Sequence, residues 1–201
     1  MNVFGIWDYA TEIMTDYVYH EGEGCRGSNN VTSLIWKYLC DEGIIQLSSE
    51  KGPGKKLSPI CDNCGGQNKK RTVIRFASWL VDKKIYSEVE IVFLIKGHIK
   101  NICDRMFSVL KHTFRHQNVM TFQNMISVLN ESPNVNCFEA NHLYFYDWDT
   151  YFDGYYKRPR SGTIFQNHCF KFNISLGSGR LETKIARTDP TPIIPELKKG
   201  K

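Results

Sequence analysis

Two strand-like runs in this chain are each followed by a polar cluster and then by a helix-like segment. The first run, residues 56–60, precedes the polar residues 61–70, and the apolar run 89–95 precedes the polar residues 97–105. Strands that alternate with helices predict an α/β fold, in which the ends of neighbouring strands gather at one edge of a sheet. The two polar clusters should therefore meet at that edge.

Each polar cluster contains an acid, Asp62 in the first and Asp104 in the second. Two carboxylates at one sheet edge are suited to hold Mg²⁺ or Mn²⁺, as in enzymes that cleave phosphodiesters with two ions. Cations flank both clusters, namely Lys51, Lys55, Lys56, Lys69, Lys70, Arg71, Arg75, Lys96, Lys100, Arg105, Lys111 and Arg115. This arrangement favours DNA as a partner, although the same cations could simply form solvated helix faces.

Composition sets wider bounds on the class of protein. With 201 residues, of which 41% are hydrophobic, the chain can bury a substantial core. No apolar run approaches the roughly 18 to 20 residues of a membrane span, and the acidic N-terminal region does not resemble a signal peptide. Seven cysteines at scattered spacings are typical of reduced thiols. We expect an intracellular protein, with a nuclear location if it acts on DNA, and the oligomeric state, a homo-oligomer included, is left open.

Hydrophobic periodicity predicts the elements along the chain. It predicts strands at 3–7 and 17–20 as a hairpin, a helix at 31–41, a strand ending at 61, a helix at 69–83, a strand at 88–95, and helices at 101–116 and 121–129. Residues 1–130 are expected to form the core, and residues 131–188 an aromatic-rich appendage that ends in a hairpin of 168–175 with 180–186. The basic tail 189–201 is expected to be disordered.

This order of elements is that of a ribonuclease H-like fold without its first strand, so we expect a mixed sheet flanked by helices. Two segments also resemble a transposase-derived domain of eukaryotic mobile elements. They read DNCGGQNK at 62–69 and GHIKNICDRMF at 97–107, and residues 19–24 with 28–31 add weaker support. The resemblance covers about residues 2–130. Ile99 and Lys70 depart mildly from the family pattern.

The resemblance implies that Asp62 is the second metal-binding acid and Asp104 the third. It also implies a set of polar side chains at the same edge that contact nucleic acid, to which the flanking cations Lys69, Lys70 and Arg105 are added. The polar set is Asn63, Gln67, Asn68, His98, Lys100 and Asn101. The implied ancestral activity is metal-dependent cleavage and strand transfer on DNA.

The family's first acid lies on a strand upstream of residues 3–7, so we expect an N-terminally truncated chain with an incomplete set of acids. Asp8 is the candidate replacement if the strand at 3–7 is the first. Loss of the first strand should leave the centre of the sheet unpaired unless residues 3–7 move into its place. The alternative function is a non-catalytic nucleic-acid-binding or protein-interaction domain.

Other residues offer competing metal sites. Cys61, Cys64, His98 and Cys103 are ligand types that zinc prefers, but a single pair of cysteines spaced by two residues is weak evidence, and we expect these thiols to be reduced and half-buried. His112 and His116, four residues apart on one predicted helix, make up half of a metal site at most, and a solvated helix face is the simpler interpretation.

Overall fold

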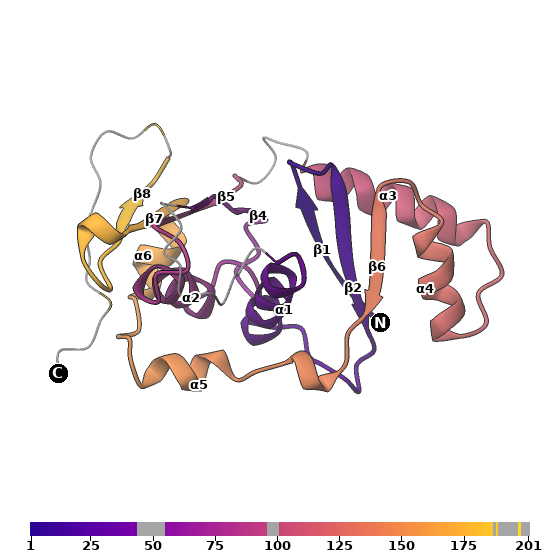
Figure 1. Cartoon of the computed structure of the whole chain (residues 1–201), viewed down its shortest axis with the longest axis horizontal. Helices are drawn as coiled ribbons and strands as arrows, with labels where there is room; N and C mark the ends of the chain where they lie inside the picture. The colour runs from indigo at the N-terminus through magenta and orange to yellow at the C-terminus, as the bar shows by residue number, and fades with distance from the viewer. Residues whose placement is uncertain (44–54, 96–100, 187, 189–196, 198–201) are drawn as a thin grey trace.

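The computed structural model describes residues 1–43, 55–95, 101–186, 188 and 197 of the chain. Within these residues the chain forms two β-sheets and six α-helices (Figure 1). Among the described helices, none is both long enough and apolar enough to cross a membrane.

The first sheet has the strand order β1–β2–β6. β1 (Asn2–Asp8) and β2 (Ile13–Tyr19) form an antiparallel hairpin, as the sequence predicts. β6 (Val135–Glu139) pairs in parallel with β2, so that Met14 lies opposite Val135. The sequence did not predict β6, which lies beyond residue 130 and yet belongs to the same sheet as the N-terminal hairpin.

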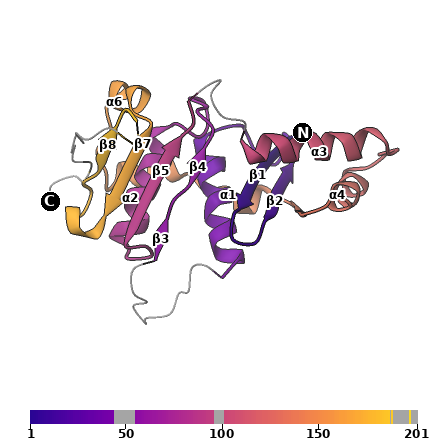
Figure 2. The same cartoon turned by 90° about the horizontal axis from the view of Figure 1, so that it is seen from above.

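The second sheet is organised around β5 (Glu88–Phe93), with β3 (Lys56–Leu57) and β4 (Ile60–Cys61) parallel to it on one side. Ser58 and Pro59 separate the two short strands, because a proline cannot donate a ladder hydrogen bond. On the other side of β5, β7 (Cys169–Asn173) and β8 (Glu182–Lys184) follow in antiparallel order. The predicted terminal hairpin is therefore confirmed, and it extends this sheet (Figure 2).

Four predicted helices are confirmed, with ends that differ from the expected positions by a few residues. They are α1 (Ser28–Asp41), α2 (Arg71–Asp82), α3 (Ile102–Arg115) and α4 (Phe122–Asn130). Later in the chain come α5 (Trp148–Asp153), α6 (Ser161–Gln166) and two short 3₁₀ turns, η1 (His142–Tyr144) and η2 (Ile174–Leu176).

Alternation along β2 divides the interior into two cores. Tyr17 and Tyr19 point to the larger core, which contains α1, α2, α5, β5 and β7. Met14 and Val18 point the other way, into a smaller core that α3 and α4 close. Asp16 lies between Met14 and Val18 in this alternation, so its carboxylate belongs to the smaller, apolar core.

The expected fold class is confirmed, since mixed sheets flanked by helices make up the described chain. The expected single sheet is divided in two, however. β1 pairs with β2 and forms an edge of the first sheet, while β3 and β4 form an edge of the second. β1 has not moved into the place of a central strand, because its local hairpin with β2 fixes its position.

Candidate functional site

The two predicted acidic segments come close together, at the end of β4 and the start of α3. Asp62 directly follows β4, and Asp104 lies in the first turn of α3; both are exposed. Burial is the main cause that raises the pKa of Cys61, and Cys103 contributes to the same shift, so these two residues, which directly precede the acids, lie near each other. The side chain of Asn101 caps α3 by accepting a hydrogen bond from the Cys103 amide at 3.2 Å, which fixes where α3 begins.

The described residues place no third potential metal ligand beside Asp62 and Asp104. Among the described residues, no group of three or more His, Cys, Asp or Glu side chains is positioned to hold a metal ion. Asp8 serves other contacts: its carboxylate accepts a hydrogen bond from the Ala10 amide at 2.8 Å and bonds to the Tyr38 side chain of α1. Two predicted site residues, His98 and Lys100, lie outside the described residues.

The thiols near this edge are held in their neutral form. Burial raises the pKa of Cys61 to about 12 and also raises the pKa of Cys103. A thiol must lose its proton to bind zinc, so both residues would need the ion itself to displace that proton. The rings of His112 and His116 lie 4.5 Å apart on the exposed side of α3.

Lys69, predicted to contact nucleic acid, is buried instead, with 2% of its surface exposed. Its Nζ donates a hydrogen bond to the Phe165 carbonyl oxygen at 3.2 Å and lies 5.6 Å from the centre of the Phe93 ring. Burial lowers the pKa of this ammonium. Its role in the described structure is to join the loop before α2 to the segment of α6, which leaves it out of reach of a phosphate.

The other polar residues of the predicted site keep some contact with solvent. Lys70 and Arg105 are exposed, whereas Asn63, Gln67 and Asn68 are half-buried in the loop between β4 and α2. This loop is closed by hydrogen bonds from the Gln67 and Lys69 amides to the Cys64 carbonyl oxygen. Exposed cations therefore remain at this edge for an anionic partner, although fewer than the sequence predicts.

Sequence reasoning missed Asp16, a buried acid of β2 that lies close to α3. It is fully buried, and both its carboxylate oxygens lack a hydrogen-bond partner among the described residues. Burial raises its pKa from 3.8 to about 7. Gly5 lies opposite it on β1, where a Cβ atom would come 2.6 Å from Asp16 Oδ1 and 3.0 Å from Phe107 Cζ. Glycine therefore lets α3 pack closely over this carboxyl group.

Comparison with known proteins identifies the family of this chain. Residues 2–188 match the family described as Domain of unknown function (DUF7869). The chain belongs to this DUF7869 family. No curated protein and no solved structure matches it. The match includes β6, β7 and β8 as well as the N-terminal elements, so both sheets of the described structure lie within the DUF7869 region.

A buried arginine organises the contact between α2 and α5 in this DUF7869 chain. Arg75 has none of its side chain exposed; its Nη2 donates to Asp149 Oδ1, and its Nη1 donates to Asp153 Oδ1 at 2.7 Å. Arg71 also binds Asp149, at 2.6 Å, and Arg158 binds Asp153. The Arg71 hydrogen bond is the main cause that lowers the pKa of Asp149 to about 2. Two of the cations predicted to surround the acidic cluster thus stabilise the fold.

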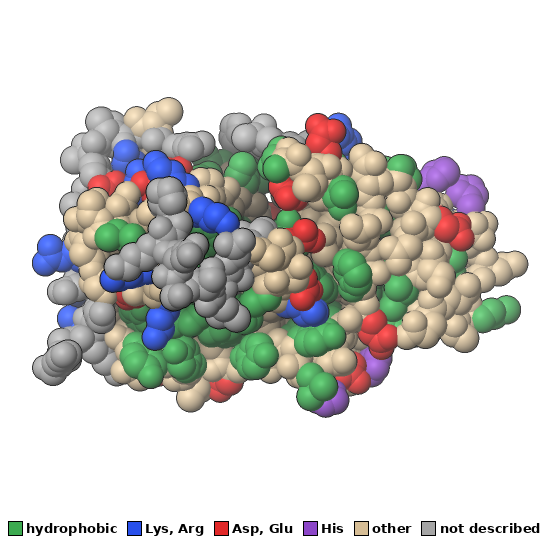
Figure 3. Space-filling view, viewed as in Figure 1, with side chains coloured by type: hydrophobic (Ala, Val, Ile, Leu, Met, Phe, Trp, Pro, Cys, Tyr) green, Lys and Arg blue, Asp and Glu red, His purple; other side chains and the backbone are tan. Residues whose placement is uncertain are grey.

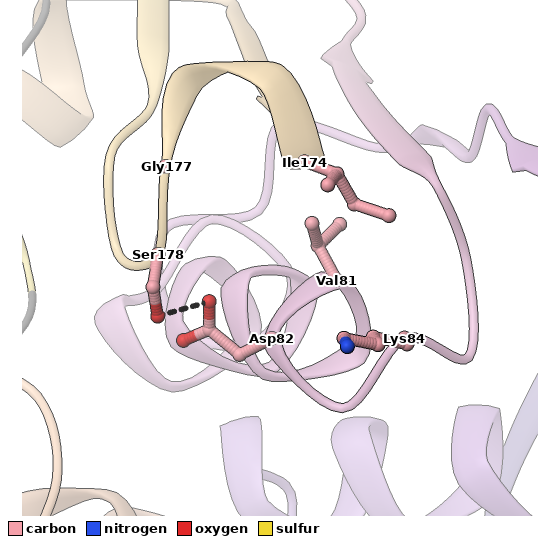
Figure 4. Close-up of a pocket in the computed structure, with 6 residues that line it drawn as sticks. All are labelled: Val81, Asp82, Lys84, Ile174, Gly177 and Ser178. Carbon is pink, nitrogen blue, oxygen red and sulfur yellow. Dashed lines mark hydrogen bonds between the residues drawn. The ribbon is translucent and has the colours of Figure 1, made fainter.

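A small cavity of about 130 Å³ lies between the end of α2 and the turn that joins β7 to β8 (Figure 4). Its carboxylate, Asp82, is already bonded, because Ser178 Oγ donates to its Oδ1 and Tyr156 Oη to its Oδ2, both at 2.6 Å. The Ser178 bond ties the C-terminal hairpin to α2, and the Tyr156 bond ties the segment after α5 to α2. The packing of these segments against α2 therefore explains this cavity.

Proposed function

We propose that this chain is a transposase-derived domain that binds DNA at the edge formed by the end of β4 and the start of α3, and that it does not cleave DNA in the form described. The observation that carries the proposal is the proximity of Cys61 and Cys103, which brings the segments of Asp62 and Asp104 to one place. Lys70 and Arg105 supply exposed positive charge there.

The contacts of Asp8 and Asp16 support the proposal that the chain does not cleave DNA. A two-metal reaction needs several carboxylates around the ions, whereas Asp8 is bonded to Ala10 and Tyr38, and Asp16 is buried beneath α3. Incubation of supercoiled plasmid with the full chain and Mn²⁺ checks this point. If the wild type nicks the plasmid and Asp62→Asn does not, a DNA-cleaving enzyme becomes the better proposal.

This edge offers some of the ligands that Mg²⁺ or Mn²⁺ needs. Asp62 and Asp104 would hold the ion, because carboxylate oxygens are the ligands that these hard cations prefer. A bound ion of this kind supplies charge stabilisation to a phosphodiester and lowers the pKa of a coordinated water. Two exposed carboxylates, with no third acid beside them in the described part of the chain, support weak binding at most.

We expect calorimetry to detect weak Mn²⁺ binding by the full chain and to lose that signal in Asp62→Asn. The charge of the carboxylate is removed while its shape is kept, so the loss would report on the ion. Glu131→Gln is the matched control, because Glu131 is an exposed acid at the end of α4. Equal binding by the wild type and Asp62→Asn would remove Asp62 from the proposed metal site.

DNA binding should be independent of sequence and sensitive to salt. We expect fluorescence anisotropy with a duplex oligonucleotide to show tight binding at low salt that weakens steeply toward physiological salt, because bound counterions are released from the phosphates. The double variant Lys70→Gln with Arg105→Gln should bind more weakly, and its salt slope should fall by about 1 for each cation that no longer binds a phosphate.

The matched control for this experiment removes the same charge elsewhere. Lys83 and Lys157 are exposed, at the other end of α2 and after α5. Lys83→Gln with Lys157→Gln should leave the salt slope close to that of the wild type. Failure of the wild type to bind at low salt, or equal effects of the two double variants, would contradict the proposed site.

A further inference from the structure

Three segments far apart in the sequence line an open cavity of about 480 Å³. Its described lining residues are Trp36 of α1, Trp79 of α2, and Tyr146, Asp147, Trp148 and Tyr151 from α5 and the residues before it. Figure 3 shows hydrophobic side chains gathered on the face of the molecule along which α5 runs. Tyr146 and Tyr151 are 54% and 41% exposed, so the cavity opens to solvent.

The rings meet at steep angles rather than in a parallel stack. Trp36 and Trp79 have ring centres 5.3 Å apart and planes at 71°, and Trp79 and Trp148 lie 5.6 Å apart at 64°. Trp148 and Tyr151 lie 6.0 Å apart at 86°. The indole of Trp148 is fixed by a hydrogen bond from its Nε1 to Ser33 Oγ at 3.0 Å. These edge-to-face contacts line the cavity with aromatic rings in several orientations.

The charge of the cavity is negative. Of the described lining residues, Asp147 alone carries a charge. Its Oδ1 accepts hydrogen bonds from the Thr150 amide at 3.2 Å and from Asn29 Nδ2 at 2.9 Å. Bonding to Thr150 and Asn29 lowers the pKa of this carboxyl group, so it is ionised at neutral pH. The faces of aromatic rings are also negative, and together these groups attract a cation.

One lining group also lacks a partner. The indole nitrogen of Trp79 is buried and has no acceptor among the described residues. A buried donor without an acceptor carries a free-energy cost.

We propose that this cavity binds a trimethylated lysine side chain of a partner protein. A trimethylammonium group keeps its positive charge but has no N–H to donate, so aromatic faces suit it better than polar groups do. The aliphatic stem of the lysine would pack against the same rings. The volume leaves room for this side chain and for part of the adjoining backbone.

A lipid choline headgroup carries the same cation, but the protein source fits the charges better. Cellular membrane surfaces are anionic, and the exposed, ionised Asp147 disfavours approach to such a surface. This proposal is independent of DNA binding, because the cavity is formed by α1, α2 and α5 and not by the end of β4 or the start of α3.

Titration of the full chain with a short Gly/Ser-flanked peptide that contains one trimethyl-lysine tests the proposal. Tryptophan fluorescence is the readout, since Trp36, Trp79 and Trp148 line the cavity. The neutral carbon analogue, with a tert-butyl group in place of trimethylammonium, should bind at least about tenfold more weakly. Equal affinity for the two peptides, or no saturable binding of either, would overturn the proposal, as would preferential binding to phosphatidylcholine vesicles.

Two variants distinguish a loss of cation binding from a change in the fold. Asp147→Asn retains an N-cap side chain and removes the charge, and Tyr151→Leu removes one wall; each should weaken binding about tenfold. Tyr155→Leu is the matched control, because Tyr155 is 56% exposed, lies next to Tyr151 and does not line the cavity. An equal loss in Tyr151→Leu and Tyr155→Leu would also overturn the proposal.

Discussion

Replacement of Arg75 by methionine should lower the free energy of unfolding by about 3–5 kcal/mol, because it removes one partner from a buried ion-pair network. The guanidinium has no exposed surface and joins Asp149 and Asp153 of α5 to α2. It also lies 5.8 Å from the centre of the buried Phe152 ring. Methionine fills much of the same volume, so the loss would reflect the lost contacts of Arg75 with Asp149 and Asp153 more than a cavity.

Urea denaturation followed by circular dichroism measures this change as a shift in midpoint at constant slope. Arg115→Met is the matched control, since Arg115 is exposed near the end of α3 and should change stability by less than about 0.5 kcal/mol. A loss below about 1 kcal/mol for Arg75→Met would mean that the aromatic contacts and the Arg71–Asp149 ion pair hold α5 to α2 without Arg75.

The stability of the wild type should fall by about 3 kcal/mol as the pH rises from 5 to 8, because Asp16 must ionise inside an apolar core. Its pKa is raised from 3.8 to about 7, so the native state holds a proton that the unfolded state has already lost. A raised acid pKa contributes stability below the unfolded value, and that contribution is lost as the pH passes through the folded value. Above pH 8 the decline due to Asp16 should end.

Two titratable groups near Asp16 do not change their charge in this pH range. The nearby Cys103 and Cys137 have raised pKa values, the latter about 12, so they remain neutral thiols. Asp149 has the opposite shift, to about 2, and its contribution is lost only as the pH falls below about 4.

Asp16→Asn should abolish the pH dependence between pH 5 and 8 and should be more stable than the wild type at pH 8. Asp104→Asn, an exposed acid on α3, is the control and should keep the wild-type slope. The measurement is the urea midpoint at several pH values in the presence of a reducing agent. A flat profile for the wild type would show that Asp16 is paired or hydrated in solution.

The local elements could be predicted from the sequence because each carries its own signal. The aromatic and β-branched run at 17–20 indicates the second half of β2, and the helical spacing of apolar residues gives α1, α2, α3 and α4. The glycine-containing turn between β7 and β8 similarly indicates the terminal hairpin. For the candidate site, the polar residues after β4 and before α3 indicate a common edge, which the proximity of Cys61 and Cys103 supports.

Long-range pairing could not be predicted, because its partners lie far apart in the chain. β6 is five residues long and pairs with β2 more than a hundred residues earlier, so no local pattern identifies it. Arg75 reads as a surface cation on a helix until Asp149 and Asp153 arrive from α5. Lys69 is buried by the chain around Phe165 in the same way.

The sequence by itself determined four of the helices, the two terminal hairpins, the two acidic segments and the excess of positive charge, because these depend on neighbouring residues. Only the tertiary structure decided which charges are available to a partner. Burial removed Lys69 and Arg75 from the surface and left Asp16 beneath α3 without a hydrogen-bond partner among the described residues. Packing of α1, α2 and α5 gathered three tryptophans and two tyrosines around Asp147. The physical reason is that solvation and pairing of a charge depend on contacts across the whole chain.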